Sequence, residues 1–436
     1  MKNFIGALVF SFFSVGVISA QMYVPIDTAN LVLRTKESKM YEEGAKFYNS
    51  LALEDYKNGE RSLFKKRCEG MNKVMKEDLL SGKYVFDTRF KKMMDTIVSE
   101  ISTKNIQLPL GLNFYVARDN TLNASSLGNK YFVVNMGSFY FLQNEDQLSA
   151  IICHEIAHYI LKHVLKDIQY QYSLKKQTEL KNEISMIKEN NENKSDKAYN
   201  KLKNLLYKEE DLNKQQEYEA DSLGYVLYKN TRYKRVDYIN SFKLQQAYDT
   251  IRPLGLHLDT YKKVFSLPAQ PFKVEWLKIE DFSKYDYSKF KAKYNEDSLS
   301  SHPDTELRIK ALLKSFPELA IAEKEMVATA NFDSLSTVAK FEQPYVFEFQ
   351  EEYGLGVYFC LFRLQQKENV AYYNNRLGVL FQKIYEARKA YTLNRYLERM
   401  DPKDQSVSYQ QFLSFMWNLN LTELKNIADY YKEARL

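Results

Sequence analysis

The sequence is poor in the residues that interrupt regular structure, because its 436 residues include only 14 glycines and 9 prolines. This scarcity favours helices, and the chain contains no low-complexity tract. The 3 cysteines, Cys68, Cys153 and Cys360, are odd in number and widely spaced. They predict no disulfide framework, and we interpret Cys153 as a small buried residue.

Long hydrophobic runs are also missing. After residue 20, no stretch approaches the 18 or more apolar residues that a membrane-spanning helix requires. The formal net charge of +6 is spread along the chain without a polybasic block, so we expect no nucleic-acid binding. Hydrophobic residues make up 45% of the chain, which predicts a folded protein of two or three domains.

Histidine is scarce too, yet two of the 5 histidines stand in one short motif. His154 and His158 are four positions apart, so on a helix they project from one face and can bind a single Zn²⁺. Glu155 lies beside the first of them, where a carboxylate can take a proton from water at the metal. The alternative is a buried helix with two hydrogen-bonded histidines. His163 lies off the shared face and is predicted to be a surface residue, and His257 is interpreted as structural.

A catalytic zinc site needs a third protein ligand and one open position. Glu217 and Asp221 are again four apart on a predicted helix, so both carboxylates can face the same site. One can bind the metal, and the other can accept the free ring N–H of a ligating histidine. Without the histidine motif upstream, the two acids would indicate only a solvated helix face.

The segments HEIAH (154–158) and EYEAD (217–221) resemble a family of zinc metallopeptidases. That family includes the CAAX prenyl proteases, the HtpX heat-shock peptidases and the soluble, exported BepA-type proteases. Three further segments resemble family motifs: Asn123 to Gly128, Tyr131 to Asn135, and Ser301-His302-Pro303 with Glu306 to Ile309. Ser125 and Gly128-Asn129 depart from the family pattern in the loop on the substrate side. The resemblance spans roughly Asn113 to Leu313.

The resemblance implies an α+β, predominantly α-helical fold with a zincin-like core around a small β-sheet. It also implies that Glu217 completes a site for one Zn²⁺ per chain with His154 and His158, and that Asp221 is the outer carboxylate. Glu155 is then the catalytic base.

The later family segment carries two more candidate site residues. The resemblance implies that His302 donates a hydrogen bond to the oxyanion during catalysis, or occupies the fourth zinc position in a resting state. Arg308 is predicted to support this segment or to pair with Asp221.

Substrate binding is predicted at the strand Tyr131 to Asn135, with Tyr131, Val133 and Asn135 as contact residues on an open edge. A peptide that pairs with an edge strand is recognised mainly through its backbone, which suits unfolded substrates. We therefore expect an endopeptidase for unfolded or misassembled envelope proteins. The alternatives are a latent protease-fold protein that acts as a chaperone or scaffold, and a helical interaction protein with a structural zinc.

Residues 1–20 have the pattern of a secretory signal peptide. Lys2 supplies the positive start, Phe4 to Val17 is mostly apolar, and Ala20 is the small residue before the expected cleavage point. The alternative is an uncleaved N-terminal anchor. We expect an exported protein, periplasmic or secreted, without a membrane span after cleavage.

The rest of the chain is predicted to form a helical region (21–85), a peptidase domain (86–318) and a helical domain (319–436). Residues 161–216 are predicted to be a helical insert, either a solvated hairpin or a lid over the cleft. One tetratricopeptide-like register fits the C-terminal domain at Leu377, Gly378, Phe381, Ala390 and Pro402. This domain is therefore either a degenerate helical repeat that binds a protein partner or a nonrepetitive helical domain.

Overall fold

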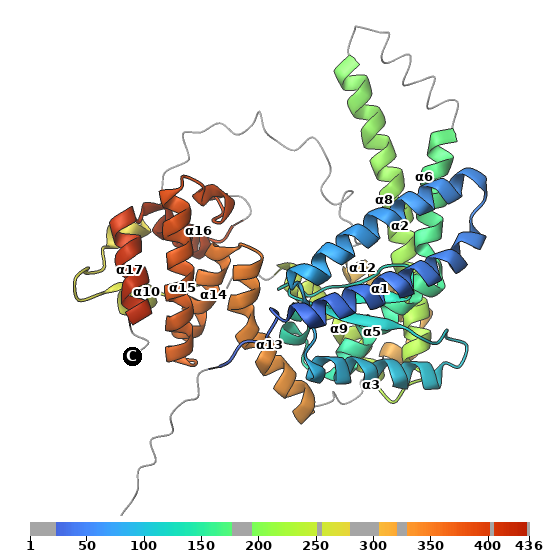
Figure 1. Cartoon of the computed structure of the whole chain (residues 1–436), viewed down its shortest axis with the longest axis horizontal. Helices are drawn as coiled ribbons and strands as arrows, with labels where there is room; N and C mark the ends of the chain where they lie inside the picture. The colour runs from blue at the N-terminus through green and yellow to red at the C-terminus, as the bar shows by residue number, and fades with distance from the viewer. Residues whose placement is uncertain are drawn as a thin grey trace, which may run out of the picture.

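The computed structural model describes residues 23–176, 194–250, 255–279, 305–320, 329–401 and 405–433. The predicted signal peptide, His302 and Pro402 lie outside the described residues. The fold is predominantly helical with one small sheet, as predicted. In Figure 1 the sheet lies among helices on one side of the molecule, and a second group of helices lies on the other.

The N-terminal region forms two antiparallel helices, α1 (Leu31–Ala52) and α2 (Asn58–Ser81). The short 3₁₀ helix η1 (Leu53–Asp55) connects them. α1 begins where the Asn30 side chain accepts a hydrogen bond from the Leu33 N–H, which satisfies a free backbone donor. α2 ends at Gly82, whose φ of 84° lies in the left-handed region that glycine adopts without strain.

The sheet has four strands: β1 (Tyr84–Val85), β2 (Asn113–Ala117), β3 (Ala124–Ser126) and β4 (Tyr131–Asn135). Their spatial order is β1-β2-β4-β3. β2 and β4 are parallel, whereas β1 and β3 run antiparallel to their neighbours. β2 and β4, both rich in β-branched and aromatic residues, therefore form the centre of the sheet.

Alternate side chains of β4 enter two separate cores, because successive residues of a strand point to opposite faces. Phe132 and Val134 pack in the main core with α3 (Thr88–Lys104) and α5 (Glu145–Ile160). Tyr131 and Val133 pack on the opposite face with side chains of α1 and α2. The sheet thus lies between the N-terminal helix pair and the helix that carries the histidine motif.

The prediction that Tyr131 to Asn135 presents an open edge is wrong. β4 pairs with β2 on one side and with β3 on the other. The Tyr131 and Val133 side chains are buried, and the Asn135 amide donates to the Thr121 hydroxyl at 2.8 Å. These three side chains are therefore engaged within the fold, and the edge strand on this side is β3.

The remaining helices of this half follow the sheet in sequence. They are α4 (Met136–Phe141), α6 (His163–Lys176), α8 (Lys194–Tyr228), α9 (Arg235–Thr250), α12 (Thr305–Ser315) and the short η5 (Pro317–Ala320). α6 and α8 come from the predicted insert and extend away from the body in Figure 1. Their bases flank the histidine motif, whereas the function of the insert as a lid stays a prediction.

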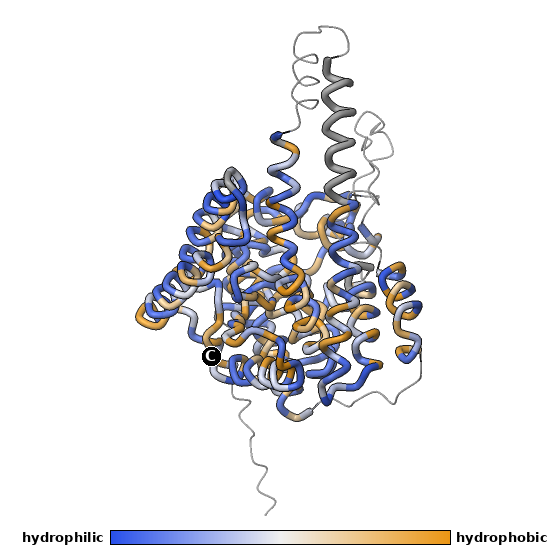
Figure 2. Tube along the Cα trace, turned by 90° about the vertical axis from the view of Figure 1, so that its right-hand side faces the viewer, coloured by the Kyte–Doolittle hydropathy of each residue, from blue (hydrophilic) through white to orange (hydrophobic). Residues whose placement is uncertain are grey.

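The second half contains α13 (Ala330–Phe349), α14 (Tyr353–Gln365), α15 (Val370–Lys389), η6 (Leu393–Arg395), α16 (Val407–Asn418) and α17 (Leu421–Glu433). Gly378 lets α15 approach α17 closely, because a Cβ there would lie 3.0 Å from the Tyr431 carbonyl carbon. Figure 2 shows hydrophobic and hydrophilic residues interspersed along the helices.

Residues 255–279 also belong to this second core, although they precede residue 319. They form α10 (Leu258–Phe265) and η2 (Val274–Leu277), and Phe265 and Trp276 are buried among the C-terminal helices. The predicted boundary therefore does not separate the two cores, because a segment of the predicted peptidase domain completes the C-terminal one.

The first described residues link the two halves. The Tyr23 hydroxyl donates to Glu342 Oε1 at 2.7 Å, and the Ile26 N–H donates to the same oxygen at 2.9 Å. The Tyr23 ring stacks on Phe341 with centroids 5.0 Å apart. In the part of the chain that the structure describes, we find no helix with the length and apolarity to cross a bilayer.

Candidate metal centre

Helix α5 is fixed at its start by polar contacts and along its length by the main core. The Asn144 side chain accepts a hydrogen bond from the Gln147 N–H at 2.9 Å and caps the helix. Leu148, Ile152 and Ile156 are fully buried on one side. This packing leaves the histidines of the motif on the side that lines a cleft of about 540 Å³.

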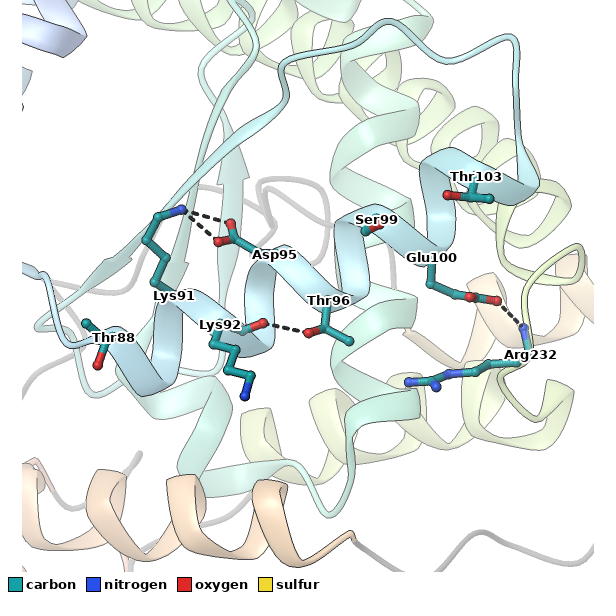
Figure 3. A pocket seen from close by; sticks show the side chains of 9 residues that line it. All are labelled: Thr88, Lys91, Lys92, Asp95, Thr96, Ser99, Glu100, Thr103 and Arg232. Carbon is teal, nitrogen blue, oxygen red and sulfur yellow. Dashed lines mark hydrogen bonds and ion pairs between the residues drawn. The ribbon is translucent and has the colours of Figure 1, made fainter.

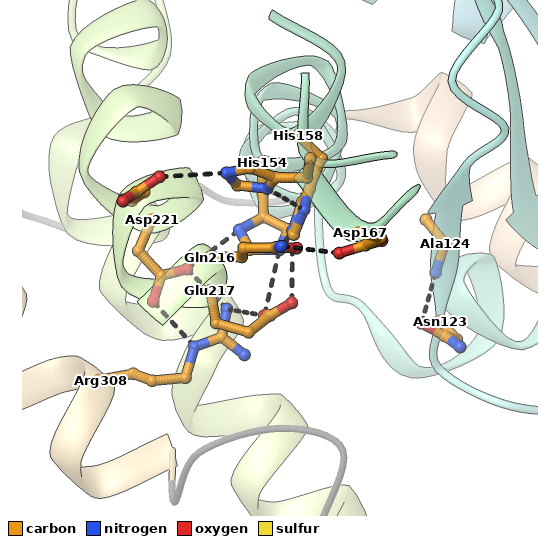
Figure 4. Close-up of polar contacts among 11 residues, drawn as sticks. Asn123, Ala124, His154, His158, Asp167, Gln216, Glu217, Asp221 and Arg308 are labelled. Atoms are coloured by element: carbon orange, nitrogen blue, oxygen red, sulfur yellow. Dashed lines mark hydrogen bonds and ion pairs between the residues drawn. The ribbon is translucent and has the colours of Figure 1, made fainter. Parts of the chain in front are cut away.

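Three side chains converge in this cleft. The Nε2 atoms of His154 and His158 are 2.9 Å apart. Glu217 on α8 places Oε1 3.3 Å from His158 Nε2 and Oε2 3.5 Å from His154 Nε2. Figure 4 shows the three side chains pointing toward one another from α5 and α8. One ligand atom from each residue lies within 4.8 Å of the other two, so together they could hold one metal ion.

A glycine makes this convergence possible. Gly224 lies on the same helix as Glu217 and faces α5, where an added Cβ would lie 3.1 Å from the Cα of His154. Such a contact is tighter than the packing between these helices allows without a shift. The absence of a side chain at Gly224 therefore lets α8 bring its carboxylates within reach of the histidines.

The second carboxylate of α8 supports the first histidine. Asp221 Oδ1 lies 2.9 Å from His154 Nδ1, and Arg308 donates from Nε to Asp221 Oδ2 at 2.8 Å. Arg308 Nη2 also lies 3.2 Å from Glu217 Oε2. Arg308 thus pairs with Asp221, as one of its two expected arrangements required, whereas residues 301–304, which the other arrangement concerns, lie outside the described residues. Figure 4 shows this chain of contacts from α12 through α8 to α5.

The charges of these four groups depend on one another because Asp221, Glu217 and Arg308 are buried and the His154 side chain is only 13% exposed. Burial alone would raise the pKa of Asp221, but Arg308 and His154 outweigh it and hold this pKa below its ordinary value. Burial alone would lower the pKa of His154, but Asp221 and Glu217 outweigh it and raise this pKa to about 10. The carboxylates therefore favour positive charge at the point where the ligand atoms meet.

The prediction that His163 is a surface residue is wrong. Its side chain is buried, and its Nδ1 lies 2.8 Å from the Nδ1 of His158. Its Nε2 lies 3.3 Å from Glu219 Oε2. Burial, together with the nearby His158 and Lys166, lowers the pKa of His163 to about 4. His257, in contrast, is exposed at the start of α10 and lies outside the site.

Glu155 faces the same cleft as the three converging residues. Among the described residues, it forms no hydrogen bond or ion pair, although only 9% of its surface is exposed. Its carboxylate is therefore available to a molecule in the cleft. The β3 residues Ala124, Ser125 and Ser126 line the same cleft and place the edge of the sheet beside the histidines.

Zinc fits this set of donors. Two imidazole nitrogens and one carboxylate oxygen form the donor set of a catalytic zinc site with three protein ligands. Tetrahedral bonds of about 2.0–2.1 Å set ligand atoms roughly 3.3 Å apart, close to the 2.9 Å, 3.3 Å and 3.5 Å separations observed. Asp221 and His163 meet the ring nitrogens that face away from this point.

A second hollow of about 610 Å³ lies along α3 and does not share this chemistry. Several of its polar groups pair with one another: Lys91 pairs with Asp95, the Thr96 hydroxyl donates to the Lys92 carbonyl, and the Arg232 N–H donates to Glu100 (Figure 3). This surface therefore presents no reactive group comparable with the histidine cleft.

Comparison with known proteins agrees with the geometry. A model of Peptidase family M48 matches residues 88–315, more than half of the chain. This chain belongs to peptidase family M48. The match begins at the first residue of α3 and ends at the last residue of α12. The match therefore contains all three converging residues. As a member of family M48, this chain is a metallopeptidase.

One curated relative matches a shorter segment of the M48 chain. Over 70 residues the chain is 29% identical to the "Putative beta-barrel assembly-enhancing protease" of Vibrio cholerae serotype O1 (strain ATCC 39315 / El Tor Inaba N16961). The matched segment is 16% of this chain and 14% of that protein. The chain thus matches about one seventh of the length of this relative.

The start of α5 carries a buried acid that makes stability depend on pH. Asp146 is fully buried, its Oδ2 accepts the Lys234 N–H at 3.0 Å, and its Oδ1 has no partner among the described residues. Burial, with Asp237 and Glu145 nearby, raises the pKa of Asp146 to about 6. Because the folded pKa exceeds the unfolded one, ionisation of Asp146 destabilises the fold as pH rises from about 4 to about 6.

We expect Asp146→Asn to remove this loss, because asparagine does not ionise and can still accept the Lys234 N–H. The variant should exceed the wild type in unfolding free energy by about 2 kcal/mol at pH 7.5, with a much smaller difference at pH 4.5. Urea unfolding at both pH values measures this, with the exposed Asp95→Asn as the matched control. A difference that does not change with pH would contradict the expectation.

Proposed function

We propose that this chain is an exported, zinc-dependent endopeptidase that hydrolyses peptide bonds in unfolded or misassembled proteins, as part of envelope protein quality control. The observation that carries the proposal is the convergence of His154, His158 and Glu217 in an open cleft beside Glu155, whose carboxylate has no hydrogen-bond or ion-pair partner among the described residues. Export rests on the signal-peptide pattern of residues 1–20.

The residues of the cleft divide the chemistry among them. Zinc held by His154, His158 and Glu217 would polarise a water molecule and the scissile carbonyl. Glu155 accepts the proton that the attacking water gives up and delivers it to the leaving amine. Asp221, supported by Arg308, keeps the His154 ring in the tautomer whose Nε2 carries a lone pair. His302 remains the candidate donor to the oxyanion.

The edge strand β3 replaces β4 as the proposed peptide-binding strand. The Leu127 N–H donates to Tyr131 O at 2.9 Å, and the Asn135 N–H donates to Asn123 O at 3.0 Å. Because bonding alternates along an antiparallel ladder, the backbone groups of Ser126 point away from β4, toward the open side. The Ala124 N–H is taken by the Asn123 side chain at 2.8 Å (Figure 4). An extended substrate would therefore pair with Ser126.

Replacing Ser126 by proline tests this assignment. Proline removes the outward N–H but leaves the hydrogen bonds to β4 in place. We expect kcat/KM for an unfolded peptide to fall roughly 10-fold or more, since about 1–2 kcal/mol of hydrogen bonding is lost. Zinc content should stay unchanged. Ser126→Ala keeps the N–H and serves as the control, and equal activity in both variants would exclude pairing at this residue.

The substrate class is tested with two proteins of different compactness. Zinc-loaded mature protein should cleave casein, which is unfolded, and leave a compact globular protein intact at the same concentration. Full zinc occupancy without cleavage of either protein would contradict the proposal and favour the latent, chaperone-like alternative.

A further inference from the structure

His163 reaches the metal centre through a reversal of the chain. α5 ends at Ile160, and Lys162 adopts a left-handed φ of 54° before α6 begins at His163. The Lys162 ammonium holds this turn through Asp55, with Nζ–Oδ2 at 2.8 Å. The turn brings the His163 ring back against His158, with ring centroids 4.8 Å apart.

The contacts of His163 determine where each hydrogen lies. His158 Nε2 faces the other ligand atoms, so this nitrogen carries the lone pair and its Nδ1 carries the hydrogen. That N–H points at His163 Nδ1, 2.8 Å away, which must therefore be the unprotonated nitrogen. His163 Nε2–H then donates to Glu219 Oε2 at 3.3 Å.

Charged and polar partners fix Glu219, the last acceptor in this series of hydrogen bonds. Lys166 Nζ lies 2.6 Å from Glu219 Oε2, and the Gln215 amide donates to Glu219 Oε1 at 2.9 Å. The series of contacts from His158 through His163 and Glu219 to Lys166 thus parallels the series from His154 through Asp221 to Arg308 on the other ligand. Each ligand histidine has its own hydrogen-bond acceptor, and each acceptor is held by a cation at the end of the chain.

We propose that His163 is a positioning residue for zinc: a neutral imidazole that accepts the Nδ1–H of His158 and so fixes the tautomer and ring orientation of this ligand without touching the metal. This inference rests on the proposed zinc site. It assigns a function to a third histidine that is neither a ligand nor a surface residue. Outer partners of ligand histidines typically contribute 10–100-fold to metal affinity.

The test compares two substitutions that differ in hydrogen-bonding capacity. His163→Phe keeps a planar ring but offers no acceptor, whereas His163→Asn can place an oxygen near the position of Nδ1. Zinc dissociation constants are measured by competition with a chromophoric chelator. We expect roughly 10–100-fold weaker binding in His163→Phe and a much smaller loss in His163→Asn. The exposed His257→Phe controls for the loss of a histidine and should bind zinc like the wild type.

Thermal unfolding of the zinc-stripped variants separates positioning from packing. Equal zinc affinity in His163→Phe and the wild type overturns the inference. So does an equal loss of affinity in both His163 variants, since the acceptor would then be irrelevant. If His163→Phe does not fold, His163→Asn with near wild-type affinity and His163→Leu with weakened affinity support the inference. Absence of zinc binding by the wild type overturns the proposed function itself, which is a separate result.

Discussion

Replacing Glu155 by glutamine is expected to lower kcat/KM for an unfolded peptide by about 10³-fold while zinc content stays at one ion per chain. Glutamine has nearly the same size, but its amide cannot accept the proton of the attacking water. A positioned general base typically contributes about 10²–10⁴-fold to the rate. Because Glu155 forms no hydrogen bond or ion pair among the described residues, the substitution breaks no hydrogen bond that holds the site.

Peptide hydrolysis and zinc content are measured on the same preparation. Glu275→Gln changes an exposed acid on η2, outside the cleft, and should leave both values unchanged. Activity of Glu155→Gln within 10-fold of the wild type would contradict the assignment of Glu155 as the base. A chaperone activity, if present, should survive the substitution because it needs no proton transfer.

Replacing Arg308 by methionine is expected to cost about 3–5 kcal/mol of unfolding free energy, because it leaves buried carboxylates without their cation. The Arg308 side chain is 4% exposed and contacts both Asp221 and Glu217. Without it the pKa of Asp221 should rise, and a protonated Asp221 can no longer accept the His154 ring N–H. Zinc binding should therefore weaken as well.

Urea unfolding of zinc-stripped protein measures the first effect, so that lost metal does not add to it. Arg308→Lys keeps the charge but cannot form the bidentate contact with Asp221. Its unfolding free energy should therefore lie between those of the wild type and Arg308→Met. The control is Arg232→Met, which breaks an exposed pair with Glu145 and should cost less than about 1 kcal/mol. A similar cost at both arginines would contradict the buried-pair account.

The parts of the site that sequence predicts are those set by local helix geometry. His154 and His158, and likewise Glu217 and Asp221, are four residues apart, and this spacing alone puts each pair on one face of a helix. The central strands β2 and β4 also carry a strong signal, because their residues are aromatic and β-branched. These elements lie where the pattern places them.

The errors concern features that depend on distant parts of the chain. β4 carries the strongest strand pattern but lies inside the sheet, because β3, with 3 residues, is too short to give a pattern and pairs with it. His163 was expected on the surface because a helix continued from α5 would turn it away. The left-handed Lys162 reverses the chain instead, and lysine gives no signal for such a turn.

The packing of residues 255–279 was missed for the same reason, because it depends on distant parts of the chain. Leu256, Tyr261 and Trp276 look like ordinary core residues in sequence, and their spacing does not say which core they join. Only the assembled C-terminal helices provide the surface that buries them. Sequence therefore predicted the helical class of residues 319–436, but not that a segment inside the family match completes their core.

The central claim is that one zinc ion, held by His154, His158 and Glu217, makes this chain a peptidase. The most direct measurement is casein cleavage by zinc-stripped mature protein as zinc is added in steps. The account predicts no cleavage at the start, a linear rise, and a plateau at one zinc per chain. Cleavage that is already full without zinc, or zinc bound at one equivalent with no cleavage, would contradict it.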